Sequence, residues 1–468
     1  MPVNSVRYLC ALSACLPIAS LHTSPLLAQT RPNIILIVAD DMGSADLSCL
    51  DSPDIQTPNI DQLAANGVRF TNAYTTAAVC SPSRAALYTG RYQQSFGYEF
   101  NLPHNLPDDP MYGIPLSLTT LPEQLQSQNY TTALVGKYHL GMHEKQTPNN
   151  RGFDHFFGFL SGGHPYAVNA RRSKLMHNNK SANTDQYLTD ELGDQAANFI
   201  NQNKTNPFYL MLSFNAPHTP MQATNEDLAR FKHIEDESRR TYAAMVYSMD
   251  RAIGNVLQSL NKNNLTQNTM IIFLSDHGGA TPMNTASNDP FRGNKSTLFE
   301  GGIRVPFIIS YPGKLPVDVT YDHPISSLDI FPTALAAAGT PQSAINQQSF
   351  HGQNLLPYLI QQNKSQPHPT LYWRTGRSFA IRHGDWKLIK VKRSRTIALY
   401  NLTNDPSEQN NLSDKYPDKV RELQVMHDDW ADTLIDPLWE EERHDTSRNR
   451  NSQRNNNASN NRRQRRNN

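Results

Sequence analysis

Two apolar runs in the sequence end in residues that could bind a metal ion. Asp40 and Asp41 follow the run NIILIVA. Asp276 and His277 follow the run TMIIFLS. Adjacent carboxylates repel each other unless they face water or a cation, and their oxygens favour Ca²⁺, or less often Mg²⁺, over zinc. The pattern predicts a site for a hard divalent cation, Ca²⁺ or Mg²⁺, although Asp40 and Asp41 alone fit an exposed turn equally well.

Four basic side chains could surround an anion near such a metal. Lys137 and His139 lie just beyond the run TTALV, and residues two apart on an extended backbone point to one side. His218 lies just after the run FYLMLSF, and Lys295 lies in a loop predicted ahead of a helix. Each side chain alone is more often a solvated charge. Together around a metal they predict a pocket for a tetrahedral oxyanion ester, sulfate or phosphate.

The stretch VCSPSRAALYTGR adds a candidate reactive group, Cys80. If SPSRAALYTG opens a helix, Cys80 and Arg84 share one face near its N-terminus, where unpaired N–H groups attract anions. Cys80 could be a small buried thiol, or it could pair with Cys49 in a disulfide if the protein is exported. It could also be a nucleophile, or the precursor of one.

Apolar strands alternate with amphipathic helices along most of the chain. This predicts an α/β fold with a large, doubly wound, mainly parallel sheet flanked by helices over residues 31–365. Shorter alternating runs and one helix predict a smaller C-terminal α+β domain with an antiparallel sheet over 366–445. Ligands of open parallel sheets bind beyond the carboxyl ends of the strands. The candidate residues should therefore converge there.

Both ends of the chain differ from this body. Residues 1–28 read as a signal peptide, which predicts a periplasmic or secreted protein; lipidation at Cys15 is the alternative. No later run has the length of a transmembrane segment. Residues 446–468 are rich in Asn and Arg and read as disordered. A net charge of +1 gives no overall field for binding nucleic acid.

The motif CSPSRAALYTGR resembles the signature of the type I sulfatases, in the alkaline phosphatase superfamily. The resemblance extends over roughly 32–432 through RPNIILIVADDMG, GKYHLG, APHTP, SDHGG, NKSTLFEGGIRVPFI and GDWKLI. It implies that Cys80 is oxidised to Cα-formylglycine by a formylglycine-generating enzyme before folding. One hydroxyl of the hydrated aldehyde then attacks sulfur, and the other expels sulfate. In this view the Cys49–Cys80 disulfide is the reading to discard first.

The resemblance also implies a role for each candidate residue. Arg84 and Lys137 would steady the diol and the sulfate, and His139 would be the base for the elimination step. His218 and Lys295 would hold the sulfate and protonate the leaving oxygen. Ca²⁺ would be held by five residues: Asp40, Asp41, modified Cys80, Asp276 and His277. Many members have Asn where this chain has His277, and others have His there.

The loops 95–115 and 161–184 favour a sulfated carbohydrate over a small aryl ester. Candidate substrate-binding residues are His104, His164, Tyr166, Arg171 and Arg374. Algal polysaccharides such as carrageenan or ulvan are the first substrate class, and glycosaminoglycans are the second. Two other readings stay open: a phosphate or phosphonate monoester hydrolase of the same superfamily, and a non-catalytic binder of sulfated glycans.

Overall fold

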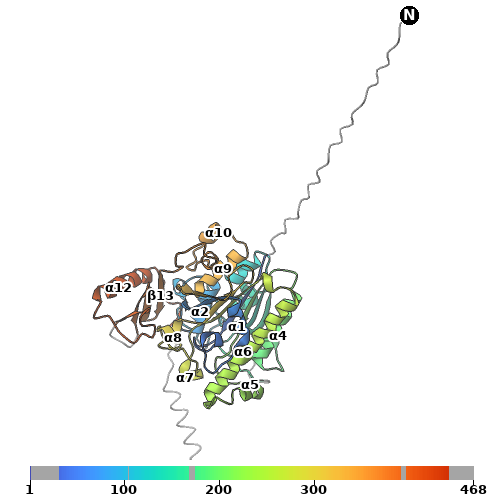
Figure 1. The fold of residues 1–468 in the computed structure, drawn as a ribbon, viewed down its shortest axis with the longest axis horizontal. Coiled ribbons are helices and arrows are strands. Elements are labelled where there is room, and N and C mark those ends of the chain that lie inside the picture. The colour runs from blue at the N-terminus through green and yellow to red at the C-terminus, as the bar shows by residue number, and fades with distance from the viewer. Residues whose placement is uncertain (2–30, 104, 168–173, 392–396, 442–468) are drawn as a thin grey trace, which may run out of the picture. The chain divides into compact units, whose positions relative to one another are not determined.

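A ten-stranded sheet forms the centre of the chain from Arg31 onward (Figure 1). The computed structural model describes residue 1 and residues 31–103, 105–167, 174–391 and 397–441. The strand order is β11-β2-β10-β9-β1-β8-β4-β5-β6-β7. The middle strands run parallel to one another and are β9 (Thr269–Ser275), β1 (Asn33–Ala39), β8 (Phe208–Ser213), β4 (Thr131–Lys137) and β5 (His155–Phe159).

The edges of this sheet contain antiparallel strands. β10 (Phe307–Ser310) runs antiparallel to both β9 and β2 (Gly67–Phe70), and β11 (Val319–Tyr321) pairs with β2 in parallel. At the other edge, β6 (Leu175–His177) runs antiparallel to β5 and to β7 (Lys180–Ala182). The predicted large, mainly parallel sheet flanked by helices is therefore confirmed, with mixed edges.

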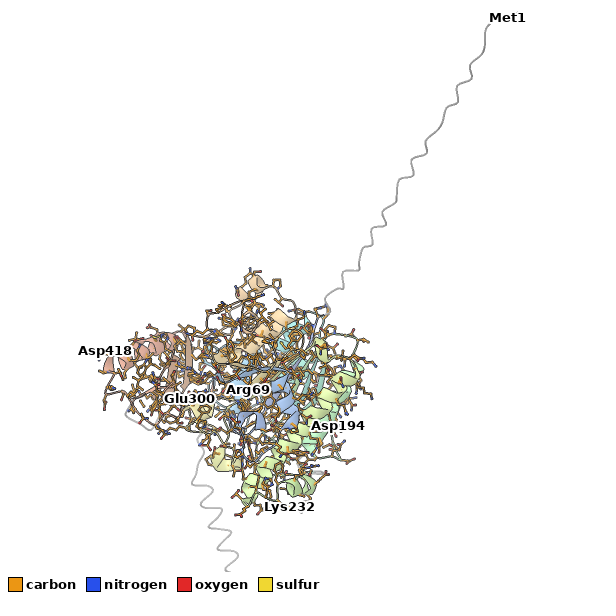
Figure 2. The ribbon with its side chains drawn as sticks, viewed as in Figure 1. Met1, Arg69, Asp194, Lys232, Glu300 and Asp418 are labelled. Atoms are coloured by element: carbon orange, nitrogen blue, oxygen red, sulfur yellow. The ribbon has the colours of Figure 1, made fainter. Side chains whose placement is uncertain are left out.

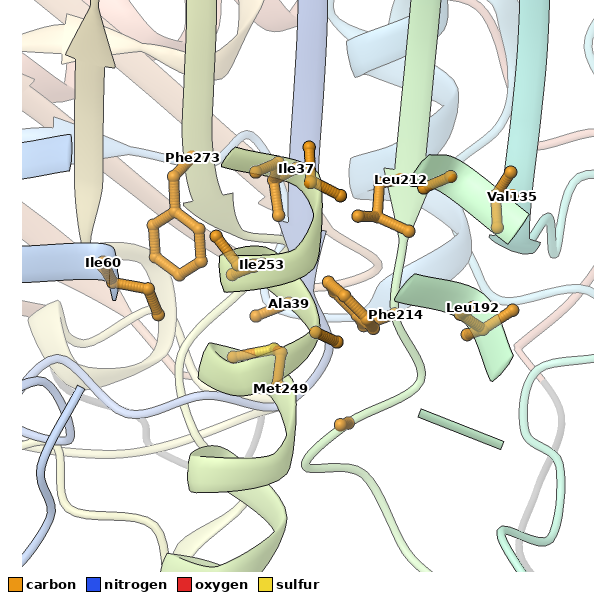
Figure 3. Packing of buried hydrophobic residues seen from close by; sticks show 14 of the residues in the cluster. Ile37, Ala39, Ile60, Val135, Leu192, Leu212, Phe214, Met249, Ile253 and Phe273 are labelled. Carbon is orange, nitrogen blue, oxygen red and sulfur yellow. The ribbon is translucent and has the colours of Figure 1, made fainter. Parts of the chain in front are cut away.

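Helices α1 (Pro58–Ala65), α4 (Leu188–Gln202) and α6 (Glu237–Lys262) cover one face of the sheet (Figure 1). Figure 3 shows Ile37 of β1 and Ile253 of α6 in the cluster that fills this layer. Fully burying one such side chain stabilises a fold by about 1.5–3 kcal/mol. This layer therefore fixes the strands whose ends carry the candidate residues.

Helices α2 (Cys80–Thr89), α3 (Leu121–Gln126) and α9 (Ile330–Ala337) cover the opposite face. Alternate residues of β1 point to the two layers, so every residue of that strand is buried. All ten residues of α2 are buried as well. Cys80, the first residue of α2, is thus held in a fixed position.

Shorter elements connect these layers. In the described chain they are α5 (Asn225–Arg230), α7 (Thr281–Asn284), α8 (Glu300–Ile303), α10 (Gln342–Asn346), α11 (Leu356–Leu359), β3 (Ala73–Tyr74) and β12 (Ile325–Ser326). β3 and β12 pair in parallel as a separate two-stranded sheet.

A second sheet is antiparallel throughout, as predicted. Its four strands and the helix beside it are β13 (Thr370–Thr375), β14 (Ser378–His383), β15 (Trp386–Lys390), β16 (Ile397–Asn401) and α12 (Pro417–Ala431). α12 buries Leu423 and His427 against it, and Trp430 stacks on Tyr372 of β13 with ring centroids 5.0 Å apart. The domain boundary near residue 365 stays a prediction.

A buried ionic cluster joins this second sheet to α8. Lys387 of β15 lies 2.8 Å from Glu300 of α8 and 2.9 Å from Glu408, and all three side chains are fully buried (Figure 2 labels Glu300). Burial would raise the pKa of Glu300, but Lys387, Arg304 and Arg382 outweigh it and lower the pKa. The cluster keeps α8, which follows the loop carrying Lys295, next to the second sheet.

Several sequence predictions cannot be compared with the structure. The predicted tail and the predicted leader, apart from residue 1, lie outside the described residues, as do His104 and Arg171. Among the residues that are described, no helix is both long and apolar enough to cross a membrane.

Replacing Lys387 should destabilise the protein strongly. Lys387→Met leaves two buried carboxylates without their shared cation, and breaking a buried ion pair in this way costs about 3–5 kcal/mol. Urea denaturation would measure the loss in the free energy of unfolding. The control, Lys364→Met, changes an exposed lysine and should lie within about 0.5 kcal/mol of wild type. Equal stabilities of the two variants would contradict the role given to the cluster.

Candidate active site

The candidate residues converge at the carboxyl edge of the parallel strands. Asp40 and Asp276 directly follow β1 and β9, and Lys137 is the last residue of β4. Potential ligand atoms of Asp40, Cys80, Asp276 and His277 lie within 4.8 Å of one another, and so do those of Asp40, Asp41, Cys80 and His218. The parallel register brings these side chains together although they are far apart in the sequence.

Cys80 lies at the centre of this group and is 2% exposed. Its Sγ atom is 3.1 Å from Nε2 of His277 and 3.5 Å from Nζ of Lys295. Burial would raise the pKa of the thiol, but Lys137 and Lys295 outweigh it and lower the pKa to about 6. Cys80 and Cys49 are both free, so the disulfide considered above does not form.

Three buried carboxylates are balanced by three side-chain cations. Nζ of Lys137 lies 2.5 Å from Oδ2 of Asp40, and Nζ of Lys295 lies 2.6 Å from Oδ1 of Asp41. The third pair joins Arg84 to Asp276 at 2.9 Å. Despite its burial, Asp40 has a pKa well below the usual value, because Lys137 and the other cations favour its charged form. Burial and the repulsion from Asp40 raise the pKa of Asp276.

Ser213, at the end of β8, was not singled out from the sequence. Its hydroxyl accepts a hydrogen bond from Nη1 of Arg84 at 2.6 Å and donates one to the carbonyl oxygen of Lys137 at 2.7 Å. It thereby fixes the guanidinium of a fully buried arginine. Its place at the end of an apolar strand was an available signal, since Asp40 and Asp276 were found by the same rule.

His277 and His218 each present Nε2 to the carboxylates. Nδ1 of His277 donates to the carbonyl of Gly278 at 2.9 Å, which leaves Nε2 3.3 Å from Oδ1 of Asp41. Burial opposes protonation of His277, but Asp276 and Cys80 outweigh it and raise its pKa to about 9. Nε2 of His218 lies 3.6 Å from Oδ2 of Asp41.

His139 lies in the site, but the backbone geometry that places it there differs from the extended strand that was predicted. Its backbone has φ of 58°, so the extended strand geometry that was to align it with Lys137 ends before it. Burial, followed by the charges of Lys137 and Arg84, lowers the pKa of His139 well below its usual value. The ring is therefore neutral, and the same cations oppose its protonation until a bound anion offsets their charge. The alignment argument was wrong, while the convergence that it predicted is present.

Two predicted substrate-binding residues have structural partners instead. Tyr166 is fully buried and its hydroxyl donates to backbone carbonyls, so it does not face a substrate. Arg374 forms a two-nitrogen ion pair with Glu99, a buried residue. This pair ties β13 to the loop after α2. His164 is buried, with Nδ1 donating to the carbonyl of Pro165, and its ring lies against Phe159.

The donor set fits a hard divalent cation. The two overlapping groups offer three carboxylates and two imidazoles, and Oδ2 of Asp41 is buried without a hydrogen-bond partner among the described residues. An acceptor left unsatisfied in this way is costly unless a cation or donor reaches it. Around the same point lie the thiol of Cys80, the neutral ring of His139, and three cationic side chains: Arg84, Lys137 and Lys295. These groups can bind an anionic ester, attack it and take up or supply a proton.

Comparisons with known families give the same picture. Residues 32–340 match the profile of the sulfatase family, and residues 293–432 match one described as N-sulphoglucosamine sulphohydrolase, C-terminal. The uncharacterized sulfatase YdeN of Escherichia coli (strain K12) is 30% identical in an alignment 504 residues long. The alignment covers 88% of this chain and 87% of YdeN.

Two further relatives are similar over most of their length. Human N-acetylgalactosamine-6-sulfatase is 34% identical over 385 residues, which cover 77% of this chain and 72% of the human protein. The crystal structure of Ps i-CgsB with k-i-k-neocarrahexaose is 37% identical and has a TM-score of 0.83, covering 90% of this chain and 97% of the other. Sulfatases are generally metal-dependent, which agrees with the acidic cluster. The chain therefore belongs to the sulfatase family of sulfuric ester hydrolases, in the alkaline phosphatase superfamily.

Proposed function

We propose that the protein is an exported sulfatase that removes sulfate esters from carrageenan or its oligosaccharides. The observation that carries this proposal is the buried meeting of Cys80 with three carboxylates and three side-chain cations. The substrate class is supported by the 37% identity to Ps i-CgsB, which was crystallised with k-i-k-neocarrahexaose. The leader at 1–28 supports a periplasmic or secreted location, with a lipid anchor at Cys15 as the alternative.

Residue 80 would act as Cα-formylglycine, produced from Cys80 by a formylglycine-generating enzyme. Sγ of Cys80 then marks where the hydroxyl oxygens of the hydrated aldehyde would lie, beside Lys295 and His277. A side chain that is 2% exposed is inaccessible to a modifying enzyme in the folded protein. Modification before folding is consistent with this burial.

The surrounding side chains divide the reaction between them. One hydroxyl of residue 80 gives its proton to Oδ1 of Asp40, which lies 3.6 Å from Sγ of Cys80, and its oxygen bonds to sulfur while the bond from sulfur to the sugar oxygen breaks. His218 and Lys295 supply the proton to that leaving oxygen. His139 then takes the proton of the second hydroxyl, so that the aldehyde reforms and sulfate departs. Arg84 and Lys137 hold the diol and sulfate oxygens throughout.

Ca²⁺ is the metal we propose for the acidic cluster, with Mg²⁺ less favoured. Asp40, Asp41, Asp276 and His277 would hold it together with residue 80. A bound divalent cation would withdraw charge from the sulfate oxygens and from the attacking hydroxyl. Oδ2 of Asp41, which has no hydrogen-bond partner within the described part of the chain, supports a ligand at this position.

Cys80→Ala should abolish sulfate release while leaving the fold intact. The alanine variant lacks the atom from which the nucleophile is made, and it removes only a small side chain. Ion chromatography would measure sulfate, and circular dichroism would check folding. The control is Cys49→Ala, which changes the other described cysteine and should stay active. Mass spectrometry of the active protein should find formylglycine at residue 80, and unmodified Cys80 in active protein would refute the mechanism.

A panel of defined oligosaccharides tests the substrate class. Sulfate should be released fastest from carrageenan oligosaccharides, and more slowly from ulvan and glycosaminoglycan fragments. The glycosaminoglycan arm is included because human N-acetylgalactosamine-6-sulfatase is 34% identical to this chain. An aryl phosphate should be a poor substrate. Fastest release from a glycosaminoglycan would overturn the carrageenan proposal while leaving the sulfatase activity in place.

Removing the metal should lower thermal stability as well as activity. At a free Ca²⁺ concentration of 100 times Kd, binding adds about 2.7 kcal/mol to the free energy of unfolding. Calorimetry of chelator-treated protein, with and without added Ca²⁺, would show this as a rise in Tm. Asp41→Asn should largely lose the rise, whereas Asp194→Asn, on α4 (Figure 2), should keep it. A similar response in all three proteins would argue against this site.

A further inference from the structure

The segment that follows β5, residues 161–166, packs against the two histidines proposed to move protons. A Cβ atom placed on Gly162 would lie 2.7 Å from Cε1 of His139 and 2.8 Å from its Nε2. A Cβ atom on Gly163 would lie 3.5 Å from Cε1 of His218, which is an ordinary contact. Only glycine fits at 162 without moving the ring, whereas alanine fits at 163.

The end of the same segment holds the turn that carries His218. The hydroxyl of Tyr166 lies 2.5 Å from the carbonyl oxygen of Asn215 and 2.7 Å from that of His218. These two residues close one turn, because the amide of His218 donates to the carbonyl of Asn215 at 2.8 Å. Nδ2 of Asn215 also donates to the carbonyl of His164 at 3.0 Å. The segment and the turn are thus joined at both ends of the turn.

The ring of His218 has a single orientation within this turn. Its Nδ1 lies 2.6 Å from the carbonyl oxygen of Thr219, and because a carbonyl only accepts, Nδ1 must donate. Nε2 is therefore left facing Asp41, at 3.6 Å. Asn284 of α7 holds the turn from another side, because its amide donates to the carbonyls of Pro217 and Asp41. Backbone position and ring orientation are both fixed.

We propose that segment 161–166 is a positioning element that sets the two histidine rings, with Tyr166 acting on His218 and Gly162 making room for His139. This inference rests on the proposed function, in which His218 protonates the leaving oxygen and His139 serves the later release of sulfate. It gives Tyr166 a role in the reaction without any contact with substrate. It also predicts that the two ends of the segment affect different chemical steps.

The dependence on leaving group distinguishes positioning from a general structural effect. A sugar alcohol is a poor leaving group and needs its oxygen protonated, whereas 4-nitrophenolate leaves with little help. Tyr166→Phe should therefore lower kcat for a sulfated carrageenan oligosaccharide about tenfold or more, since general acid catalysis contributes about 10²–10⁴-fold. It should lower kcat for 4-nitrophenyl sulfate by less than about twofold.

Tyr187→Phe is the matched control. Tyr187 is also buried, stacks on Tyr166 with centroids 5.7 Å apart, and donates through its hydroxyl to a backbone carbonyl, that of Gln222. It does not contact the His218 turn through that bond, so both substrates should be affected equally and weakly. An equal loss on both substrates in Tyr166→Phe, or the same pattern in Tyr187→Phe, would overturn the inference.

The glycine pair tests the other end of the segment. Gly162→Ala should displace the ring of His139 and slow the sulfate-release step, measured after the burst of released alcohol, about tenfold or more and by the same factor with both substrates, because the alcohol has already left at that step. Gly163→Ala should stay within about twofold of wild type on both. Equal effects of the two alanines would contradict the proposal.

Crystal structures of the variants test the positioning role of the segment without relying on sulfatase activity. Tyr166→Phe should show the 215–218 turn or the His218 ring displaced, and Tyr187→Phe should not. A Tyr166→Phe structure in which neither the turn nor the His218 ring is displaced would overturn the inference whatever the activity. A wild-type protein that releases no sulfate from either substrate would instead refute the proposed function.

Discussion

The ion pairs of Asp40, Asp41 and Asp276 with Lys137, Lys295 and Arg84 are the constraint on which the site depends. All three carboxylates and two of the cations are essentially inaccessible to water, and leaving one buried charge without its partner costs about 3–5 kcal/mol. The pairs therefore must form together. They form because parallel strands deliver their carboxyl ends to one edge of the sheet. Cys80 is held among them by a helix that is buried along its whole length.

Residues at increasing distance from the ion pairs hold the side chains of the site in place. Ser213 sets the guanidinium of Arg84, and Asn284 joins the backbone of Asp41 to the turn before His218. Segment 161–166 bounds both histidine rings. Farther out, the buried Lys387 cluster holds the helix after the Lys295 loop against the second sheet. Activity should thus be sensitive to residues that touch no substrate.

The parts of the site that depend on short stretches of sequence, such as apolar runs and residue spacing, could be predicted. The buried run before Asp40 identified a central strand, and the stretch SPSRAALYTG was considered as the opening of a helix, which α2 confirms. Asp276 gained meaning only beside Asp40, because a single carboxylate after a strand has many explanations. The predicted sheet and the predicted convergence follow from these strong, short-range signals.

What could not be predicted depended on backbone torsion and on hydrogen bonds between distant segments. The left-handed φ of His139 broke the alternation used to place it. Tyr166 and Arg374 have the composition of a sugar-binding surface, but their polar atoms are occupied by the backbone beside His218 and by Glu99. The strand-end position of Ser213 was an available signal, but its hydrogen bonds to Arg84 and to the carbonyl of Lys137 were not. Such pairings arise from tertiary contacts that no local pattern encodes.

The most direct test is a crystal structure of the matured protein grown with Ca²⁺. The account predicts an ion bound by His277 and, at about 2.3–2.6 Å, by oxygens of Asp40, Asp41, Asp276 and residue 80. Residue 80 should carry formylglycine or its hydrate. A structure with unmodified Cys80 and with no ion among the three aspartates would contradict the account.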